Sequence, residues 1–277
     1  LIAVESDHQG KMSINSLKRK IAEQKDAGKI PFCVIATSGT TVKGAFDPLP
    51  EIAEICAEEN IWLHVDAAWG GAALLSPETR NLMQGIEHSN SFCWDPHKMM
   101  GMPISCSTFL VNQQNVLREV CSHSSSAHYL LHKKNAELDM GRMSLQCARR
   151  VDALKLWLTW RSIGNQGWSE KIENYMNLTK YLSNRVKDEP TLELVLEPEF
   201  TNVCVRYVGH NLSHEFQDMI TDQIRTEMFE QGKFMVTKAL IDHRPILRPV
   251  IANPTVDQKS LDKFIAEITV IGARMAA

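Results

Sequence analysis

The chain has 277 residues, 44% of them apolar, and a net charge of −3 with acidic and basic residues interspersed. Such a chain can form one large domain, or slightly more than one, around a substantial core. This composition excludes a nucleic-acid footprint and a polybasic membrane patch, and no apolar run reaches the roughly 18–20 residues that a bilayer-spanning helix needs.

Residues 1–4 (LIAV) have the character of a strand interior. We therefore expect the chain to be a segment of a longer polypeptide, part of whose sheet lies upstream. Short apolar runs then alternate with helical patterns up to about residue 110, which predicts a mostly parallel sheet buried on both faces. The predicted strands are 32–37, 61–66, 89–94 and 104–111, and a helix is predicted over 48–59.

The second half of the chain has a different pattern. Residues 112–143 are polar and aperiodic, which predicts a long loop, and residues 144–161 predict a helix long enough to bridge two domains. Segregated helices and short strands then predict a small α+β domain. Its elements are a helix to about residue 187, strands near 192–196, 202–207 and 247–251, and helices over 212–231 and from 257.

The seven cysteines are scattered through apolar stretches and include no C-x-x-C pair. An odd, scattered set is typical of reduced, mostly buried thiols rather than of a disulfide framework. We therefore expect a cytoplasmic protein.

The carboxyl ends of two predicted strands carry residues that could hold a pyridine cofactor. Open α/β sheets bind their ligands at this edge, where Asp66 ends one strand and Lys98 follows the next. A pyridine cofactor needs an anion at its ring nitrogen and an amine that forms a Schiff base. Taken alone, Asp66 also fits a helix cap or a turn, and Lys98 also fits a solvated surface side chain.

The surroundings of this pair suit a flat ring. Small residues follow Asp66, at positions 67, 68, 70 and 71, so a ring can lie close to the backbone. The Ser-Gly-Thr-Thr turn at 38–41 ends a third strand and could add hydroxyl and backbone N–H donors.

Long motifs around these residues resemble the group II pyridoxal-phosphate-dependent decarboxylases, in particular the glutamate, cysteine-sulfinate and aspartate decarboxylase branch. They are ATSGTTVKGAFDP (36–48), IWLHVDAAWGG (61–71) and SFCWDPHKMMG (91–101). Further motifs at 145–164, 197–204 and 247–254 extend the resemblance over nearly the whole chain. The resemblance implies an α/β protein of the aspartate-aminotransferase-like fold type I. Residues 1–165 would form the carboxyl-terminal portion of the large domain, with its mostly parallel sheet, and residues 166–277 the small α+β domain.

The resemblance also implies a cofactor, pyridoxal 5′-phosphate, and a role for each matching residue. Arg248 would bind the substrate α-carboxylate, because a planar guanidinium can hold a carboxylate bidentately; the alternative is a salt bridge within the small domain. The residues implied at the cofactor are Lys98 as its covalent partner, His97 at the phosphate region, Asp66 at the ring nitrogen, Ala68 against the ring and Thr40 nearby.

Three features depart from the family pattern. Many relatives have Asn where this chain has Asp95, and an acid is unfavourable beside a phosphate, so we assign Asp95 no phosphate contact. The loop over 132–142 is short and lacks the tyrosine that the glutamate branch uses as proton donor, which leaves Tyr129, His128 and His132 as candidates for this catalytic role. The upstream half of the family's large domain lies outside these residues, so this segment alone should bind cofactor poorly.

The leading hypothesis is α-decarboxylation of a small acidic amino acid, namely glutamate, aspartate or cysteine sulfinate, to the amine and carbon dioxide. The alternatives are an aromatic-amino-acid decarboxylase on the same scaffold, or a truncated, non-catalytic fragment that contributes to a dimer. The resemblance also implies a homodimer. We predict no metal site, because His123, His128 and His132 have no acidic or cysteine partner at a recognised spacing.

Overall fold

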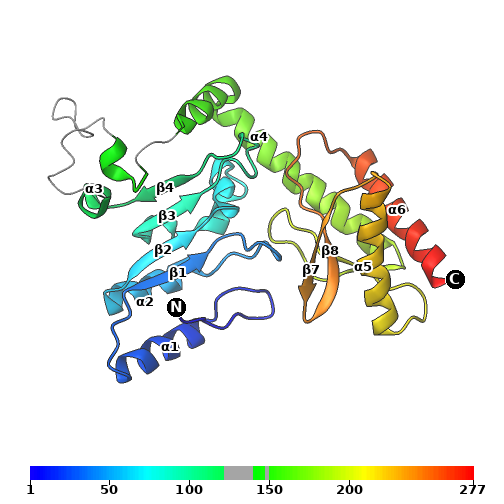
Figure 1. The fold of residues 1–277 in the computed structure, drawn as a ribbon, viewed down its shortest axis with the longest axis horizontal. Helices are drawn as coiled ribbons and strands as arrows, with labels where there is room; N and C mark the ends of the chain where they lie inside the picture. The colour runs from blue at the N-terminus through cyan, green and yellow to red at the C-terminus, as the bar shows by residue number, and fades with distance from the viewer. Residues whose placement is uncertain (122–139, 147–149) are drawn as a thin grey trace.

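The computed structural model describes residues 1–121, 140–146 and 150–277. It has two units, drawn in blue to green and in yellow to red in Figure 1, and the long helix α4 (Asp152–Asp188) runs from one to the other. Each unit contains a four-stranded sheet. Among the described helices, none is both long enough and apolar enough to cross a bilayer.

The first sheet has the strand order β1-β2-β3-β4. The pairs β1/β2 and β2/β3 are parallel and only β3/β4 is antiparallel, so the prediction of a mostly parallel sheet is confirmed. Helix α2 connects β1 to β2, and short 3-10 turns lead from β2 to β3. The bounds are β1 Cys33–Thr37, α2 Leu49–Glu59, β2 Trp62–Asp66, η1 Gly70–Leu75, η2 Arg80–Met83, η3 Ile86–His88, β3 Ser91–Trp94 and β4 Thr108–Val111.

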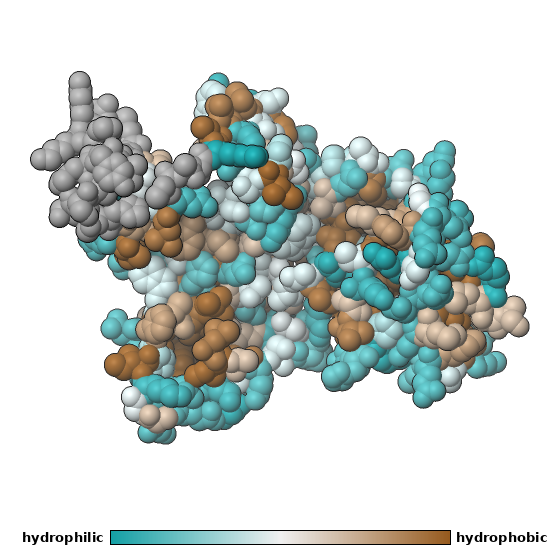
Figure 2. Space-filling model, viewed as in Figure 1, coloured by the Kyte–Doolittle hydropathy of each residue, from teal (hydrophilic) through white to brown (hydrophobic). Residues whose placement is uncertain are grey.

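The two faces of the first sheet differ in burial. Side chains that point to one face, such as Ala36, Leu63 and Val65, are at most 1% exposed. On the other face Ile35 and Phe109 are each 52% exposed, so the prediction of burial on both faces is wrong for the described residues. Figure 2 shows apolar side chains gathered over these strands and over the start of α4.

The second sheet has the order β5-β6-β8-β7, and all its pairs are antiparallel. Helices α5 and α6 pack beside it (Figure 1), which confirms the predicted small α+β unit. The strand predicted at 247–251 begins and ends earlier, and β7 was not predicted. The bounds are β5 Leu192–Leu194, β6 Val205–Tyr207, α5 His214–Glu230, β7 Thr237–Ile241, β8 Arg244–Arg248 and α6 Gln258–Ala276.

Helix α4 is interrupted at Gly164, whose φ of 73° lies in the left-handed region that favours glycine. The helix predicted from residue 144 begins at Asp152, and its second half buries Trp168, Ile172 and Tyr175. One hydrophobic core cluster includes residues of both units, from Leu17 onward. The predicted domain boundary at 165/166 therefore stays a prediction.

Three local predictions were wrong or incomplete. Residues 1–4 form no strand, because no described strand pairs with them, and Leu1 is fully exposed. Helix α1 (Ile14–Asp26) was not predicted. The predicted loop at 112–143 contains helix α3 (Val116–Cys121) and the turn η4 (Met140–Met143).

Candidate active site

The ends of β2 and β3 are joined by backbone hydrogen bonds that continue past the sheet. Ala67 N–H donates to the carbonyl of Cys93 at 3.1 Å, and Asp95 N–H donates to the carbonyl of Ala68 at 3.2 Å. These bonds fasten the segment after Asp66 to the segment that leads to Lys98. The structure therefore brings the two predicted cofactor residues to one edge of the sheet.

The carboxylate of Asp66 uses one oxygen for structure. Its Oδ1 accepts hydrogen bonds from Ala68 N–H at 3.1 Å and from the Cys93 thiol at 3.5 Å. Burial, together with the charge of Asp66, raises the pKa of Cys93 to about 11, so this thiol stays protonated and can donate. Oδ2 has no hydrogen-bond partner in the part of the chain that the structure describes. Asp66 thus forms the predicted turn contact and still has an oxygen available for a ring N–H.

Lys98 is not simply a solvated lysine. Its Nζ lies 3.0 Å from Oδ2 of Asp95, and its side chain is 40% exposed. The ring of the neighbouring His97 is held by a hydrogen bond to the backbone, since its Nδ1 lies 2.9 Å from the carbonyl oxygen of Cys106. The Nε2 side of this ring faces Asp95 at 3.8 Å.

The turn after β1 is fixed mainly by bonds within itself. The N–H groups of Gly39 and Thr40 both donate to the carbonyl of Ala45 at 2.9 Å, and Ala45 N–H donates to Oγ1 of Thr40 at 3.0 Å. Gly39 has a φ of +82°, and a Cβ there would meet Gly70 N at 2.6 Å. The N–H groups of Ser38, Gly39 and Thr40 are therefore occupied, since Ser38 N–H also donates, to the Asp66 carbonyl at 2.8 Å. The hydroxyl hydrogen of Thr40 has no acceptor among the described residues.

A cavity of about 540 Å³ lies between the two units. Lys98, Thr41 and Trp69 line it from the first unit, and Arg248 and Asn202 line it from the second. The cavity brings together the proposed covalent lysine and the proposed carboxylate-binding arginine, which are 150 positions apart in the chain.

Arg248 has unusual partners for a half-buried cation. One of its Nη groups donates to the carbonyl oxygen of Thr41, and its Nε is buried without a partner. Burial lowers the pKa of Arg248, and no described acidic residue forms an ion pair with it. The salt bridge considered as the alternative role is thus absent from the described residues. A guanidinium in this state is suited to binding an anion.

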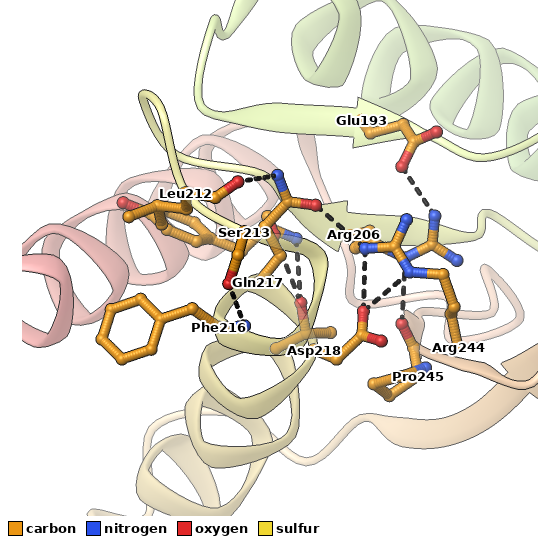
Figure 3. A network of polar contacts seen from close by, with 11 residues as sticks. Glu193, Arg206, Leu212, Ser213, Phe216, Gln217, Asp218, Arg244 and Pro245 are labelled. Carbon is orange, nitrogen blue, oxygen red and sulfur yellow. Dashed lines mark hydrogen bonds and ion pairs between the residues drawn. The ribbon is translucent and has the colours of Figure 1, made fainter.

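A polar network around Arg244 holds the start of β8 (Figure 3). Arg244 donates from Nε to Asp218 and from Nη2 to Gln217, both at 2.9 Å. These bonds tie β8 to helix α5.

Arg206, on the neighbouring strand β6, completes this network (Figure 3). Its side chain is 5% exposed and pairs with Glu193 at 2.7 Å. Its Nε donates to the carbonyl of Pro245 at 3.3 Å. The network therefore fixes the strand that carries Arg248 at its other end.

Asn202 joins the two units and was missed as an individual residue by sequence reasoning. It is 1% exposed; its Nδ2 donates to the carbonyls of Thr41 and Val42 at 3.0 and 3.2 Å. Its Oδ1 accepts from the indole N–H of Trp69 at 2.9 Å. Asn202 thus fixes the turn whose Thr41 carbonyl accepts a hydrogen bond from Arg248. Its motif at 197–204 was the available signal, but the motif gives no contact partners.

Several predicted candidates lie outside the described residues. They are Tyr129, proposed as a proton donor, and the histidines His123, His128 and His132.

Several solved structures resemble this chain closely in fold. Mouse CSAD in its apo form is 37% identical, with a TM-score of 0.91 over 97% of this chain and 58% of that chain. An Oryza sativa TDC solved with PLP and tryptamine is 24% identical with a TM-score of 0.90, and this likeness shows the fold alone. The fold is type I, as predicted.

The curated relatives are also decarboxylases. The acidic amino acid decarboxylase GADL1 of Mus musculus is 38% identical over 98% of this chain and 52% of its own length. The cysteine sulfinic acid decarboxylase of Rattus norvegicus is 40% identical over 97% of this chain and 57% of its own length. The chain thus spans a little more than half the length of these relatives.

The family described as the pyridoxal-dependent decarboxylase conserved domain matches residues 1–208, three quarters of the chain. This match includes every predicted cofactor residue, and the Arg248 segment lies beyond it in the region shared with the curated relatives. The chain belongs to the pyridoxal-dependent decarboxylase family.

Proposed function

We propose that this chain supplies the cofactor-bonding half of an enzyme that decarboxylates a small acidic amino acid at its α-carbon. The observation that carries the proposal is the cavity to which the two units contribute one group each, the amine of Lys98 and the guanidinium of Arg248. Among the described residues, this guanidinium has no acidic partner. An amine that can bond an aldehyde and a cation that can bind a carboxylate are the groups such a reaction needs.

The described residues fit pyridoxal 5′-phosphate. Lys98 supplies the amine, the free Oδ2 of Asp66 can accept the ring N–H, and the hydroxyl of Thr40 can donate. Ala68 and His97 are proposed against the ring and near the phosphate, as in the family. When bound, the cofactor supplies an electron sink for the breaking bond.

The residues of this chain would then bind and orient the substrate. Arg248 would hold the α-carboxylate and so fix the direction of the bond to be broken relative to the ring. Asp66 would keep the ring nitrogen protonated. Tyr129, outside the described residues, is our candidate to return a proton to the α-carbon.

An acidic substrate is supported by the similar relatives, which are acidic amino acid and cysteine sulfinic acid decarboxylases. We propose glutamate, aspartate or cysteine sulfinate for this chain. An aromatic amino acid is the second candidate. The observation that favours it is that apolar side chains also line the cavity, namely Phe234, Leu261 and Phe264.

We also propose a homodimer and a cytoplasmic location. The first half of α4 leaves Leu154, Trp157 and Leu158 50–58% exposed, which suits a contact with another surface. The cysteines support a reducing compartment, since all six in the described part of the chain are free.

The test is release of carbon dioxide from carboxyl-labelled glutamate, aspartate, cysteine sulfinate and an aromatic amino acid by the cofactor-loaded complete protein. We expect release from an acidic substrate, and none after Lys98→Ala. Lys29→Ala, which changes an exposed lysine just after the end of α1 and outside the cavity lining, is the matched control and should retain activity. If the loaded protein released no carbon dioxide from any amino acid, the non-catalytic alternative would replace this proposal.

A further inference from the structure

Asp95 lies three positions before Lys98 and contacts it directly. Lys98 N–H donates to the Asp95 carbonyl at 2.9 Å, which closes a turn and places both side chains together. Asp95 N–H is bound in turn to the carbonyl of Ala68. The carboxylate is therefore fixed by the ends of two strands, with its Oδ2 3.0 Å from Nζ of Lys98.

The Asp95 carboxyl is ionised near neutral pH. Burial pushes its pKa upward, but hydrogen bonds from Ser107 and Lys98, with the charges of Lys98 and His97, hold the pKa below its usual range. Its side chain is only 16% exposed, so the pair is shielded more than a typical surface ion pair.

Among the described residues, few other titratable groups face this pair. His97 Nε2 lies 3.8 Å from Asp95, and Arg248 lines the same cavity as Lys98. The thiols of Cys93 and Cys106 also face Asp95, and burial raises the pKa of each. Both thiols stay neutral near pH 7, so His97 is the neighbouring side chain whose contribution must be separated from that of Asp95.

We propose that Asp95 is a positioning residue for Lys98, which holds the ε-amino group charged and in place whenever it is not bonded to the cofactor. A nearby carboxylate favours the ammonium form of a lysine, and only the neutral amine bonds an aldehyde. The functional role of Asp95 rests on the proposed role of Lys98 as the cofactor-bonding residue. The existence of the ion pair does not rest on that role.

The test measures the rate at which trinitrobenzenesulfonate modifies Lys98 in the cofactor-free complete protein between pH 6 and 11, followed by peptide mass spectrometry. We expect Asp95→Asn to increase the rate at pH 7.5 roughly three- to tenfold, and to move the midpoint of the profile to lower pH. The rate well above the midpoint should be unchanged, because there the amine is neutral in both proteins. A parallel profile of His97→Gln separates the contribution of that ring.

The chain contains a matched control. Asp152 and Lys155 form another ion pair with the same spacing, at 2.7 Å, outside the cavity. Asp152→Asn should change the profile of Lys155 and leave that of Lys98 as in the wild type.

Two results would overturn the proposal. One is an Asp95→Asn profile identical to the wild type; the other is an equal acceleration at every pH, which would indicate greater exposure and not a change in protonation. Lys98→Met gives a reciprocal test that does not depend on the folding of the Asp95 variant. By ¹³C NMR the pKa of the Asp95 carboxyl should rise in Lys98→Met, and an unchanged value would also refute the pair.

These outcomes are distinguishable from failure of the proposed function. The labelling needs neither cofactor nor substrate, so a shifted profile supports the pair even in a protein that releases no carbon dioxide. An active decarboxylase with an unshifted profile would retain the proposed function and refute the role of Asp95.

Discussion

The two ends of strand β8 show two ways in which this protein uses a partly buried arginine. At the start of the strand, Arg244 donates to Asp218 and Gln217, and Arg206 beside it pairs with Glu193. At the end of the strand, Arg248 donates to one backbone carbonyl, and its buried Nε has no partner among the described residues. The paired arginines stabilise the fold, whereas the arginine without an acid faces a cavity that also contains Lys98.

This difference has an energetic basis. A buried charge without an opposite charge is unfavourable, and a bound anion would relieve that cost. Removing Arg248 should therefore impair binding more than folding, and removing Arg206 should do the reverse. The predictions below test this contrast.

The largest expected effect is that of Arg248→Ala on catalysis. We expect kcat/KM of the complete, cofactor-loaded protein to fall about 10²–10³-fold, since a bidentate, charge-assisted contact to the substrate is lost. The free energy of unfolding should change by less than about 1 kcal/mol, because no described ion pair is broken. Steady-state kinetics and urea unfolding measure the two effects. An unfolding loss as large as that of Arg206→Ala would contradict the contrast.

Arg206→Ala should instead reduce stability. Its side chain is 5% exposed, and truncation leaves Glu193 and the Pro245 carbonyl without their donor. We expect the free energy of unfolding to fall by about 2–3 kcal/mol, with activity per folded molecule within about threefold of wild type. Urea unfolding with activity normalised to the folded fraction checks this. A stable but inactive variant would place Arg206 in the site.

Asn202→Ala should affect both stability and catalysis, and so lie between Arg206→Ala and Arg248→Ala. The variant loses bonds to Thr41, Val42 and Trp69, and Thr41 also accepts from Arg248. We expect a stability loss of about 1–3 kcal/mol, with KM rising about tenfold as the carbonyl that holds Arg248 becomes less fixed. Urea unfolding and steady-state kinetics of the same preparation separate the stability loss from the rise in KM. The same stability loss with an unchanged KM would make the role of Asn202 purely structural.

The smallest effect is ligand stabilisation. At ten times its Kd, an acidic substrate should stabilise wild-type protein by about 1.4 kcal/mol, measured by thermal denaturation. Arg248→Ala should show no such gain at that concentration, and Arg244→Ala should show the wild-type gain from a lower starting Tm. Equal stabilisation of wild type and Arg248→Ala would show that the ligand binds elsewhere.

The elements around the lysine could be predicted because local patterns define them. Short apolar runs mark β1, β2 and β3, and the rule that ligands bind at strand ends brings Asp66 and Lys98 together. Strand β7 was missed because its hairpin turn uses Asp242 and His243, at φ 51° and 63°, in place of an Asn-Gly or Asp-Gly pair. Helix α1 was missed because it buries only a narrow stripe that includes Leu17 and Ile21.

The decisive features of the site depend on contacts between distant segments. Sequence reasoning left open whether Arg248 forms a salt bridge, because the answer depends on which acids the folded sheet places near it. The hydrogen bond of Asn202 to Thr41 spans 161 positions and follows only from the docking of the two units. The pairing of Asp95 with Lys98 is local by contrast, but it depends on the geometry of the turn that closes between them.

The central claim is that Lys98 bonds pyridoxal phosphate at the cavity it shares with Arg248. The most direct measurement is borohydride reduction of the cofactor-loaded complete protein, followed by peptide mass spectrometry to locate the pyridoxyl group. We expect the group on the peptide that contains Lys98, and none on that peptide after Lys98→Ala. A pyridoxyl group on another lysine, or none on a protein that decarboxylates its substrate, would contradict the account.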